Sequence, residues 1–204
     1  AQKSTVITPD LPKLLKEKQL QVFNRIASVT EDKKYQNGIH LDAKANDGVA
    51  WLSDVGFENG SLEFDLKGKN VLQQSFLGIA FHGVNDSTMD VVYFRPFNFE
   101  AQDVQRRNHS VQYVSLPEFD WQRLRSQFPD QYEQPVNPAP KPDEWFHVRV
   151  EIIAHVVRVY VNNNPTPSLV VEQLSNREGG MVGFWTGNGS DGDFANLSIT
   201  TSVR

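Results

Sequence analysis

Alternation of apolar and polar residues is the feature that most constrains this chain. Residues 61–66 read SLEFDL, which puts the apolar side chains on one face of an extended segment and the polar ones on the other. Similar short runs recur from residue 20 to residue 201, separated by turn signals such as Asn59-Gly60 and Gly179-Gly180. The pattern predicts an all-β fold of about a dozen short strands, arranged as a two-sheet antiparallel jelly-roll sandwich.

The predicted domain organisation is simple. The 204 residues fit a single domain (1–204), since all-β sandwiches of this length commonly remain undivided. Residues 1–19 are expected to form an N-terminal extension with one short helical turn. Residues 116–144 form one long Pro-rich loop that is far longer than a hairpin needs. Because this loop also carries several aromatic residues, we expect it to pack over the concave face of a sheet.

Composition and charge exclude several classes of protein. The net charge of -5 argues against nonspecific binding to nucleic acid, which depends on clustered Lys and Arg. The absence of cysteine removes disulfides, thiolate nucleophiles and Cys-based zinc sites. No apolar run approaches the ~20 residues that span a bilayer, so membrane insertion is not expected. A start at residues 1–3 (AQK) would suit the end left after removal of a signal peptide, which predicts an exported, periplasmic or extracellular protein.

The stretch 91–99, VVYFRPFNF, predicts a strand that ends at a binding face. Its proline ends the backbone ladder because it has no N–H to donate. If Val92 and Phe94 face the core, Tyr93 and Arg95 share the opposite face of the sheet. A sheet face of this kind suits a sugar ring, because aromatic side chains stack on its C–H face and polar side chains bond its hydroxyls.

Neighbouring segments extend this predicted face. Phe76 and His82 fall on one face of the preceding strand, with two small residues between them that leave room for a ligand. The predicted ligand-binding residues are Tyr93, Arg95, Gln112, His82, Trp185, Asn98 and Trp121. The alternative is that the aromatic residues only support the Pro-rich loop and that Arg95 pairs with an acidic residue in it.

Carboxylates bear on whether the chain is an enzyme, which the sequence leaves open. Glycoside hydrolysis usually needs two of them, about 5–5.5 Å apart for retention and about 6.5–9.5 Å apart for inversion. The candidates for catalysis are Asp90, Glu118, Glu133 and His82. No sequence spacing pairs these carboxylates with one another. A serine-hydrolase site is less well supported still, because the chain has no G-x-S-x-G motif.

One loop has the composition of a cation site. Residues 188–193 (NGSDGD) supply several oxygen ligands on flexible backbone, as calcium loops do, which makes Asp191 and Asp193 candidate ligands of a structural Ca²⁺. The ordered positions and the closing glutamate of an EF-hand are absent, so a plain turn before the last strand is the favoured interpretation. The five histidines show no local metal-binding spacing, and no other cofactor is expected.

Several segments together resemble a known family. They are residues 75–83 (SFLGIAFHG), 91–99 (VVYFRPFNF), 145–162 (WFHVRVEIIAHVVRVYVN), 179–190 (GGMVGFWTGNGS) and 192–200 (GDFANLSIT). In order and pattern they resemble the concanavalin A-like lectin/glucanase superfamily, and within it the bacterial laminin-G-like jelly rolls and the 3-keto-disaccharide hydrolase-like domains of unknown function. The resemblance implies the jelly-roll fold and ligand contacts on its concave sheet. Of the glucanase signature of three carboxylates, only Glu63 and Asp65 are present.

Three functions therefore stay open. The first is a carbohydrate-binding or carbohydrate-active jelly roll with a glycan or oligosaccharide in the groove of the concave sheet. The alternative is a glycoside hydrolase-like enzyme that uses a carboxylate pair. A further alternative is an adhesion or structural module without a small ligand. These motifs specify fold better than activity, because one such scaffold hosts many functions.

Overall fold

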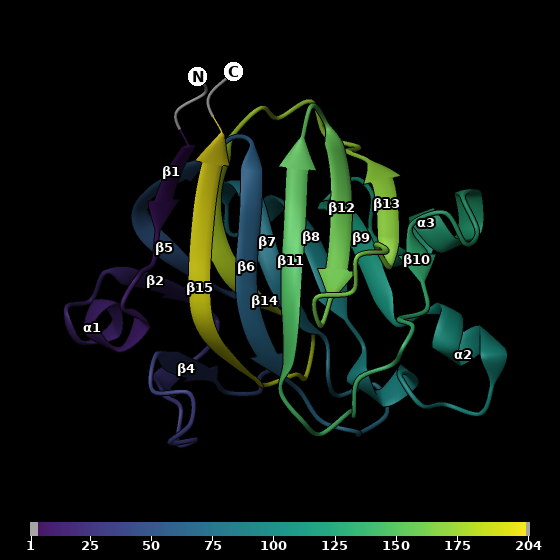
Figure 1. Cartoon of the computed structure of the whole chain (residues 1–204), viewed down its shortest axis with the longest axis horizontal. Coiled ribbons are helices and arrows are strands. Elements are labelled where there is room, and N and C mark those ends of the chain that lie inside the picture. The colour runs from purple at the N-terminus through teal and green to yellow at the C-terminus, as the bar shows by residue number, and fades with distance from the viewer. Residues whose placement is uncertain (1–3, 203–204) are drawn as a thin grey trace.

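The computed structural model describes residues 4–202, which form two antiparallel β-sheets packed face to face (Figure 1). The eight-stranded sheet consists of β1 (Ser4–Ile7), β3 (Ala27–Val29), β4 (Gly38–Leu41), β6 (Gly60–Lys67), β11 (Phe146–Ile153), β12 (Val156–Val161), β13 (Leu169–Glu172) and β15 (Gly192–Ser202). The seven-stranded sheet consists of β2 (Leu20–Phe23), β5 (Gly48–Phe57), β7 (Leu77–Asn85), β8 (Thr88–Phe94), β9 (Val111–Leu116), β10 (Glu133–Gln134) and β14 (Gly180–Thr186). The helical segments are α1 (Leu11–Lys16), the 3-10 helix η1 (Pro96–Asn98), α2 (Val104–Asn108) and α3 (Trp121–Gln127).

The strand order confirms the predicted antiparallel sandwich. The eight-stranded sheet has the order β13-β12-β11-β6-β15-β4-β3, with β1 paired to β15, and faces the viewer in Figure 1. The seven-stranded sheet behind it has the order β10-β9-β8-β7-β14-β5-β2. Neighbours in both sheets are often far apart in the sequence, as in a jelly roll.

The alternation seen in the sequence decides which side chains fill the core. Along β6, Leu62 and Phe64 are fully buried, whereas the polar residues between them are only half-buried. Val92 and Phe94 of β8 enter the same core from the other sheet. Tyr93, on the opposite face of β8, belongs to a second apolar cluster. The predicted parity of β8 is therefore confirmed.

The second apolar cluster covers the outer face of the seven-stranded sheet. Val91 and Tyr93 of β8, Val114 of β9 and Trp185 of β14 pack there with Leu124 of α3. The Pro-rich segment that contains α3 is partly regular, because β10 pairs with β9 at the edge of the sheet. In Figure 1, α3 and β10 lie together at that edge.

The N-terminal segment is built into the sandwich. Residues 1–3 lie outside the described residues, but β1 extends the eight-stranded sheet beside β15. The Asp10 carboxylate accepts a hydrogen bond from the Lys13 N–H and so caps α1, and Leu11 is fully buried. The expected extension thus contributes one strand and one helical turn to the fold.

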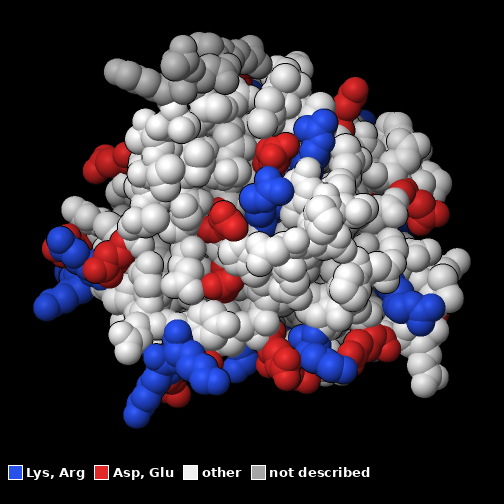
Figure 2. All heavy atoms as spheres, in the orientation of Figure 1, with Lys and Arg blue, Asp and Glu red and all other residues white. Residues whose placement is uncertain are grey.

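The outer face of the eight-stranded sheet carries charges of both signs. Figure 2 looks onto this face and shows acidic and basic side chains interspersed over a largely uncharged surface. Arg149 and Glu151, for example, form an ion pair of 3.0 Å. Within residues 4–202, no helix has the length and apolar composition needed to cross a membrane.

A histidine clamped by two carboxylates lies on this same face. The His147 imidazole lies 2.7 Å from Asp65 Oδ1 and 2.6 Å from Glu63 Oε1. The hydrogen bond to Asp65, followed by that to Glu63, raises the pKa of His147 above its ordinary value of 6.5. A raised folded-state pKa means that the protonated imidazole stabilises the fold at low pH, and that this contribution is lost as the pH rises through the folded-state pKa.

The His147 cluster predicts a specific dependence of stability on pH. At pH 5.5, the free energy of unfolding of the unsubstituted protein should be about 1 kcal/mol higher than that of His147→Gln. That difference should fade as the pH rises through the raised folded-state pKa, because the imidazole then loses its proton. Urea denaturation of both proteins at several pH values measures it. A difference that grows with pH would contradict the assignment.

Candidate functional site

A cavity of about 600 Å³ opens on the outer face of the seven-stranded sheet. Its floor is formed by Tyr93 of β8 and Trp185 of β14, and α3 contributes Trp121 and Arg125 to its wall. The rest of the lining comes from residues that follow β8 and β14 and from residues that precede β5 and β7, so the cavity lies at the end of the sheet where β8 and β14 stop. Ligand sites are commonly cavities of roughly 300–1,000 Å³.

The end of β8 is determined by the sequence. The Arg95 N–H makes a ladder hydrogen bond of 2.9 Å to the Ser110 carbonyl, and Pro96 then turns the chain into η1. The Asn98 side chain donates to the His109 carbonyl at 3.0 Å and ties this turn to the residues before β9. Arg95 is therefore the last residue of the strand region, on the same side of the sheet as Tyr93.

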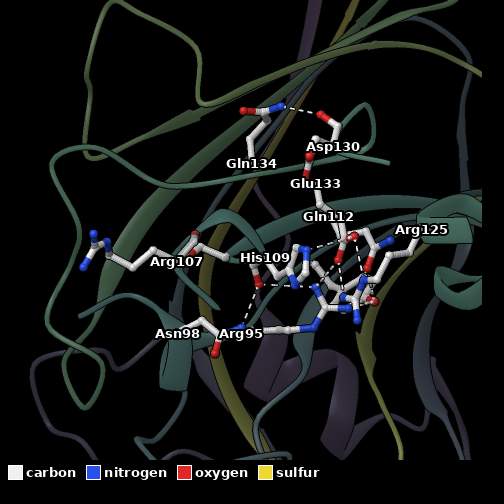
Figure 3. Close-up of polar contacts among 11 residues, drawn as sticks. Arg95, Asn98, Arg107, His109, Gln112, Arg125, Asp130, Glu133 and Gln134 are labelled. Carbon is white, nitrogen blue, oxygen red and sulfur yellow. Dashed lines mark hydrogen bonds and ion pairs between the residues drawn. The ribbon is translucent and has the colours of Figure 1, made fainter. Parts of the chain in front are cut away.

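Arg95 is the centre of a buried hydrogen-bond network beneath the cavity (Figure 3). Its Nη1 donates to Glu133 Oε1 at 3.2 Å and to the His109 carbonyl at 3.3 Å. Its Nη2 donates to the Tyr93 hydroxyl at 2.7 Å and to Gln112 Oε1 at 2.6 Å. These bonds use all four Nη hydrogens, so Nε–H is the remaining donor. The main role of Arg95 is therefore to hold the side chains of the cavity floor in place, because only its Nε–H remains to bond a ligand.

Tyr93 is held as a neutral phenol. Burial raises its pKa to about 12, so the hydroxyl keeps its proton at neutral pH. That hydroxyl donates to Gln112 Oε1 at 2.7 Å while it accepts from Arg95. With its hydroxyl fixed in this way, the ring of Tyr93 is rigidly positioned against the cavity.

Glu133 supplies the negative charge of the network. Its side chain is 2% exposed, and its carboxylate pairs with Arg95 and with both the Nε and the Nη2 of Arg125. These hydrogen bonds raise the pKa of Arg125. The His109 imidazole lies 3.7 Å from the same carboxylate, but burial lowers the pKa of His109, so it is neutral at pH 7. One carboxylate thus faces two guanidinium groups.

Four aromatic side chains line the cavity, namely Phe76, Tyr93, Trp121 and Trp185. The rings of Tyr93 and Trp185 lie 4.9 Å apart, and Phe76 meets Tyr93 edge-on at 6.3 Å. Gly187 leaves the space beside them open, because a Cβ there would lie 2.7 Å from Phe76 Cβ. The ring of Trp121, which is 42% exposed, carries the Arg125 guanidinium over its face at 4.9 Å. Such a surface suits the C–H face of a sugar.

The structure brings most of the predicted ligand-binding residues together. Those that line the cavity are Tyr93, Arg95, Asn98, Trp121 and Trp185. Gln112 is fully buried directly behind them and bonds Tyr93 and Arg95. The alternative prediction, that Arg95 pairs with an acidic residue of the Pro-rich segment, also agrees with the structure, because Arg95 pairs with Glu133. The cavity and the ion pair coexist because the pair lies beneath the floor.

His82 lies away from this site because of a β-bulge. Its φ is +48°, and the register between β7 and β8 shifts between Phe81 and Asn85. The prediction that His82 shares the face of Phe76 is therefore wrong. The imidazole is buried, lies 2.8 Å from the Glu58 carbonyl and 2.9 Å from the Gln173 side chain, and has its pKa lowered by burial.

The candidate catalytic carboxylates do not meet in one groove. Asp90 is fully buried near the start of β8, where it accepts hydrogen bonds from Ser175 at 2.7 Å and Arg177 at 3.1 Å. Glu118 is exposed and lies 3.7 Å from Arg123. Glu133 is enclosed by its arginines. Asp90 does lie near His82, at 3.8 Å, but both side chains are buried.

The remaining carboxylates of interest also lie elsewhere. Glu63 and Asp65 point from the outer face of the other sheet, where both contact His147, so they do not face the cavity. Asp191 pairs with Lys69 at 2.9 Å, and Asp193 lies 3.1 Å from both His40 and Thr30. Within residues 4–202, no three or more His, Asp or Glu side chains are grouped to hold a metal ion.

Several lining residues were not predicted. Arg106, His109 and Arg125 line the cavity, as does the exposed Asp47. The pairs of arginines at 106–107 and at 123 and 125 were visible, but helix periodicity over such short segments does not reveal which member faces the sheet. That choice depends on how α2 and α3 dock.

The two-sheet architecture is a jelly roll of the concanavalin A-like type. No protein-family model matches the sequence, and no curated protein matches it significantly. Solved structures do match: the carbohydrate-binding module CBM66 from Bacillus subtilis has a TM-score of 0.63 at 11% identity, over 90% of this chain and 96% of that one.

Two further structures have the same fold. A protein of unknown function with a galectin-like fold from Bacillus subtilis gives a TM-score of 0.64 at 11% identity over 100% of both chains. The exoplasmic/lumenal domain of VIP36, in its Ca²⁺/Man3GlcNAc-bound form, gives 0.58 at 11% identity over 100% of this chain and 91% of that one. At these identities the matches establish the fold.

Proposed function

We propose that this chain is a carbohydrate-binding protein whose ligand occupies the cavity over Tyr93 and Trp185. The observation that carries the proposal is the rigid pair of aromatic rings, 4.9 Å apart, in a cavity of about 600 Å³ bordered by polar donors. The ring of Trp121, which is 42% exposed, offers a stacking surface beside this nearly buried floor, and the amide of Asn98 and the guanidinium groups offer hydrogen bonds. Because buried bonds already hold Tyr93 and Arg95 in place, the site needs little ordering to bind.

The structural neighbours support the same proposal. CBM66 is a carbohydrate-binding module, and the VIP36 domain is described with Man3GlcNAc bound. The proposal includes export of the chain, since its expected ligand is an extracellular or lumenal glycan. It does not include hydrolysis, because the cavity within residues 4–202 is lined by a single carboxylate, Asp47, where glycosidases usually need two.

A screen of glycans by thermal and chemical denaturation tests the proposal. A glycan present at ~100 times its dissociation constant is expected to raise the unfolding free energy by about 2.7 kcal/mol. Reducing ends should not increase during the incubation. A stabilising glycan that is also cleaved would favour the enzyme alternative. A broad glycan array without any bound ligand would favour an adhesion or structural module.

A further inference from the structure

The cavity holds arginine donors that the protein itself does not use. Arg106 donates from Nε to Asn98 Oδ1 at 3.1 Å and from Nη2 to the Phe97 carbonyl at 2.6 Å. Arg125 donates from Nε and Nη2 to Glu133. Within residues 4–202, neither Nη1 group donates a hydrogen bond, although both side chains line the cavity.

Both arginines are held in position before a ligand arrives. The two hydrogen bonds of Arg106 fix its guanidinium plane against η1. The Arg125 guanidinium is fixed by Glu133 on one side and by the ring of Trp121 at 4.9 Å on the other. A guanidinium held in this way loses little entropy when it binds a planar or tetrahedral anion, which it recognises with paired N–H groups.

The charge balance around the cavity is positive, although the chain as a whole carries -5. Arg95, Arg106 and Arg125 line it, and Arg25 lies next to it, with its Nη2 donating to the Gly187 carbonyl at 2.9 Å. Within residues 4–202, three carboxylates lie near these four guanidinium groups, namely Glu133 beneath the floor and Asp42 and Asp47 beside Arg25, which leaves an excess of one positive charge. A local excess of positive charge beside aromatic walls favours an anionic ligand over a neutral one.

We infer that the ligand is an anionic glycan, a sugar that carries a carboxylate or a sulfate ester, with the anionic group at Nη1 of Arg106 and Arg125. This inference rests on the proposed carbohydrate function and narrows its ligand class. The aromatic floor takes the sugar ring, while the two arginines select the charge. A neutral sugar would leave both Nη1 groups without an ionic partner.

The test compares matched acidic and neutral sugars by isothermal titration calorimetry. The probes are a galacturonate trimer against its methyl ester, and a sulfated galactan oligosaccharide against its desulfated form. We expect at least one acidic member to bind at least 10-fold more tightly than its neutral partner at 50 mM NaCl. Its affinity should fall as NaCl rises to 500 mM, because salt screens the ion pairs. The two pairs distinguish a carboxylate from a sulfate.

Arginine variants locate the anion. Arg106→Gln should lower the affinity for the acidic probe about 10-fold and that for the neutral probe by much less, because the neutral probe loses a hydrogen bond and no ion pair. The variant should fold, because the partners of Arg106, Asn98 and Phe97, are uncharged. Arg125→Ala should act in the same direction. The matched control Arg107→Ala lies on the same helix, but its side chain points away from the cluster in Figure 3 and bonds the Ala101 carbonyl. It should change neither affinity.

The outcomes separate this inference from the proposed function. Equal affinity for acidic and neutral partners, or binding of an acidic probe unaltered by both Arg106→Gln and Arg125→Ala, would overturn the inference. If neutral sugars bind equally well and Trp185→Ala abolishes that binding, the carbohydrate function stands without the preference for charge. If no glycan binds at all, the proposed function fails and the inference fails with it.

Discussion

Replacing Glu133 by glutamine is expected to lower the free energy of unfolding by about 3–5 kcal/mol, because it removes the negative charge from a buried ion-pair network. The Arg95 side chain is 5% exposed and would keep its positive charge without a counter-charge. Glutamine preserves the size of the side chain, so the lower free energy of unfolding would measure the loss of charge and hydrogen bonding, without a contribution from an empty cavity. Urea denaturation followed by circular dichroism measures the change.

The matched control for this variant is Glu118→Gln. Glu118 lies in the same Pro-rich segment, but its side chain is 69% exposed and its ion pair with Arg123 is long, at 3.7 Å. This change should stay within about 0.5 kcal/mol of the unchanged protein. If Glu133→Gln lowered the free energy of unfolding as little as Glu118→Gln does, the neutral acceptors around Arg95 would be sufficient to hold its guanidinium. The claim that the charge of Glu133 stabilises the cavity floor would then be wrong.

Replacing Trp185 by alanine is expected to weaken glycan binding by about 30-fold or more, in line with about 2 kcal/mol for an aromatic residue at the centre of a binding site. The change removes half of the aromatic floor and the ring that packs against Tyr93. Trp185→Phe should restore part of the affinity, because a smaller ring keeps some stacking surface. Calorimetry with the glycan found by screening measures all three proteins.

Trp145→Ala provides the comparison for Trp185→Ala. Trp145 stacks on Tyr35 at 3.9 Å, and its indole donates to Asp32 at 2.9 Å, at a place apart from the cavity lining. Its loss should lower stability and leave glycan affinity unchanged. Unchanged affinity in Trp185→Ala, with the fold intact, would move the binding site away from this cavity.

Alternation along the strands made much of the fold predictable. The period of two identified the core faces of β6 and β8, and so placed Tyr93 and Arg95 on the side of the sheet where the cavity lies. The period of two does not hold at His82, because the register of β7 shifts there and the hydrophobic pattern carries no sign of the shift. A positive φ at a histidine has no sequence signature of its own.

Long-range partners were beyond the reach of the sequence. That Arg95 pairs with an acid of the Pro-rich segment was among the alternatives, but several acids were available there, and only the pairing of β10 with β9 selects Glu133. Arg106 and Arg125 were missed for a related reason. The helices that carry them have five and seven residues, too short for an amphipathic pattern to orient them.

The pairing of β10 with β9 also has a consequence for how ligand preference can change. Residues 93–133 form one continuous stretch that contains the tyrosine of the floor, the arginines of the wall and the glutamate that compensates them. The same stretch contains all of β9 and the first residue of β10, so it forms one edge of the seven-stranded sheet as well as one wall of the cavity. Exchanging it between jelly rolls would therefore change the cavity charge and that sheet edge together and leave the eight-stranded sheet unchanged.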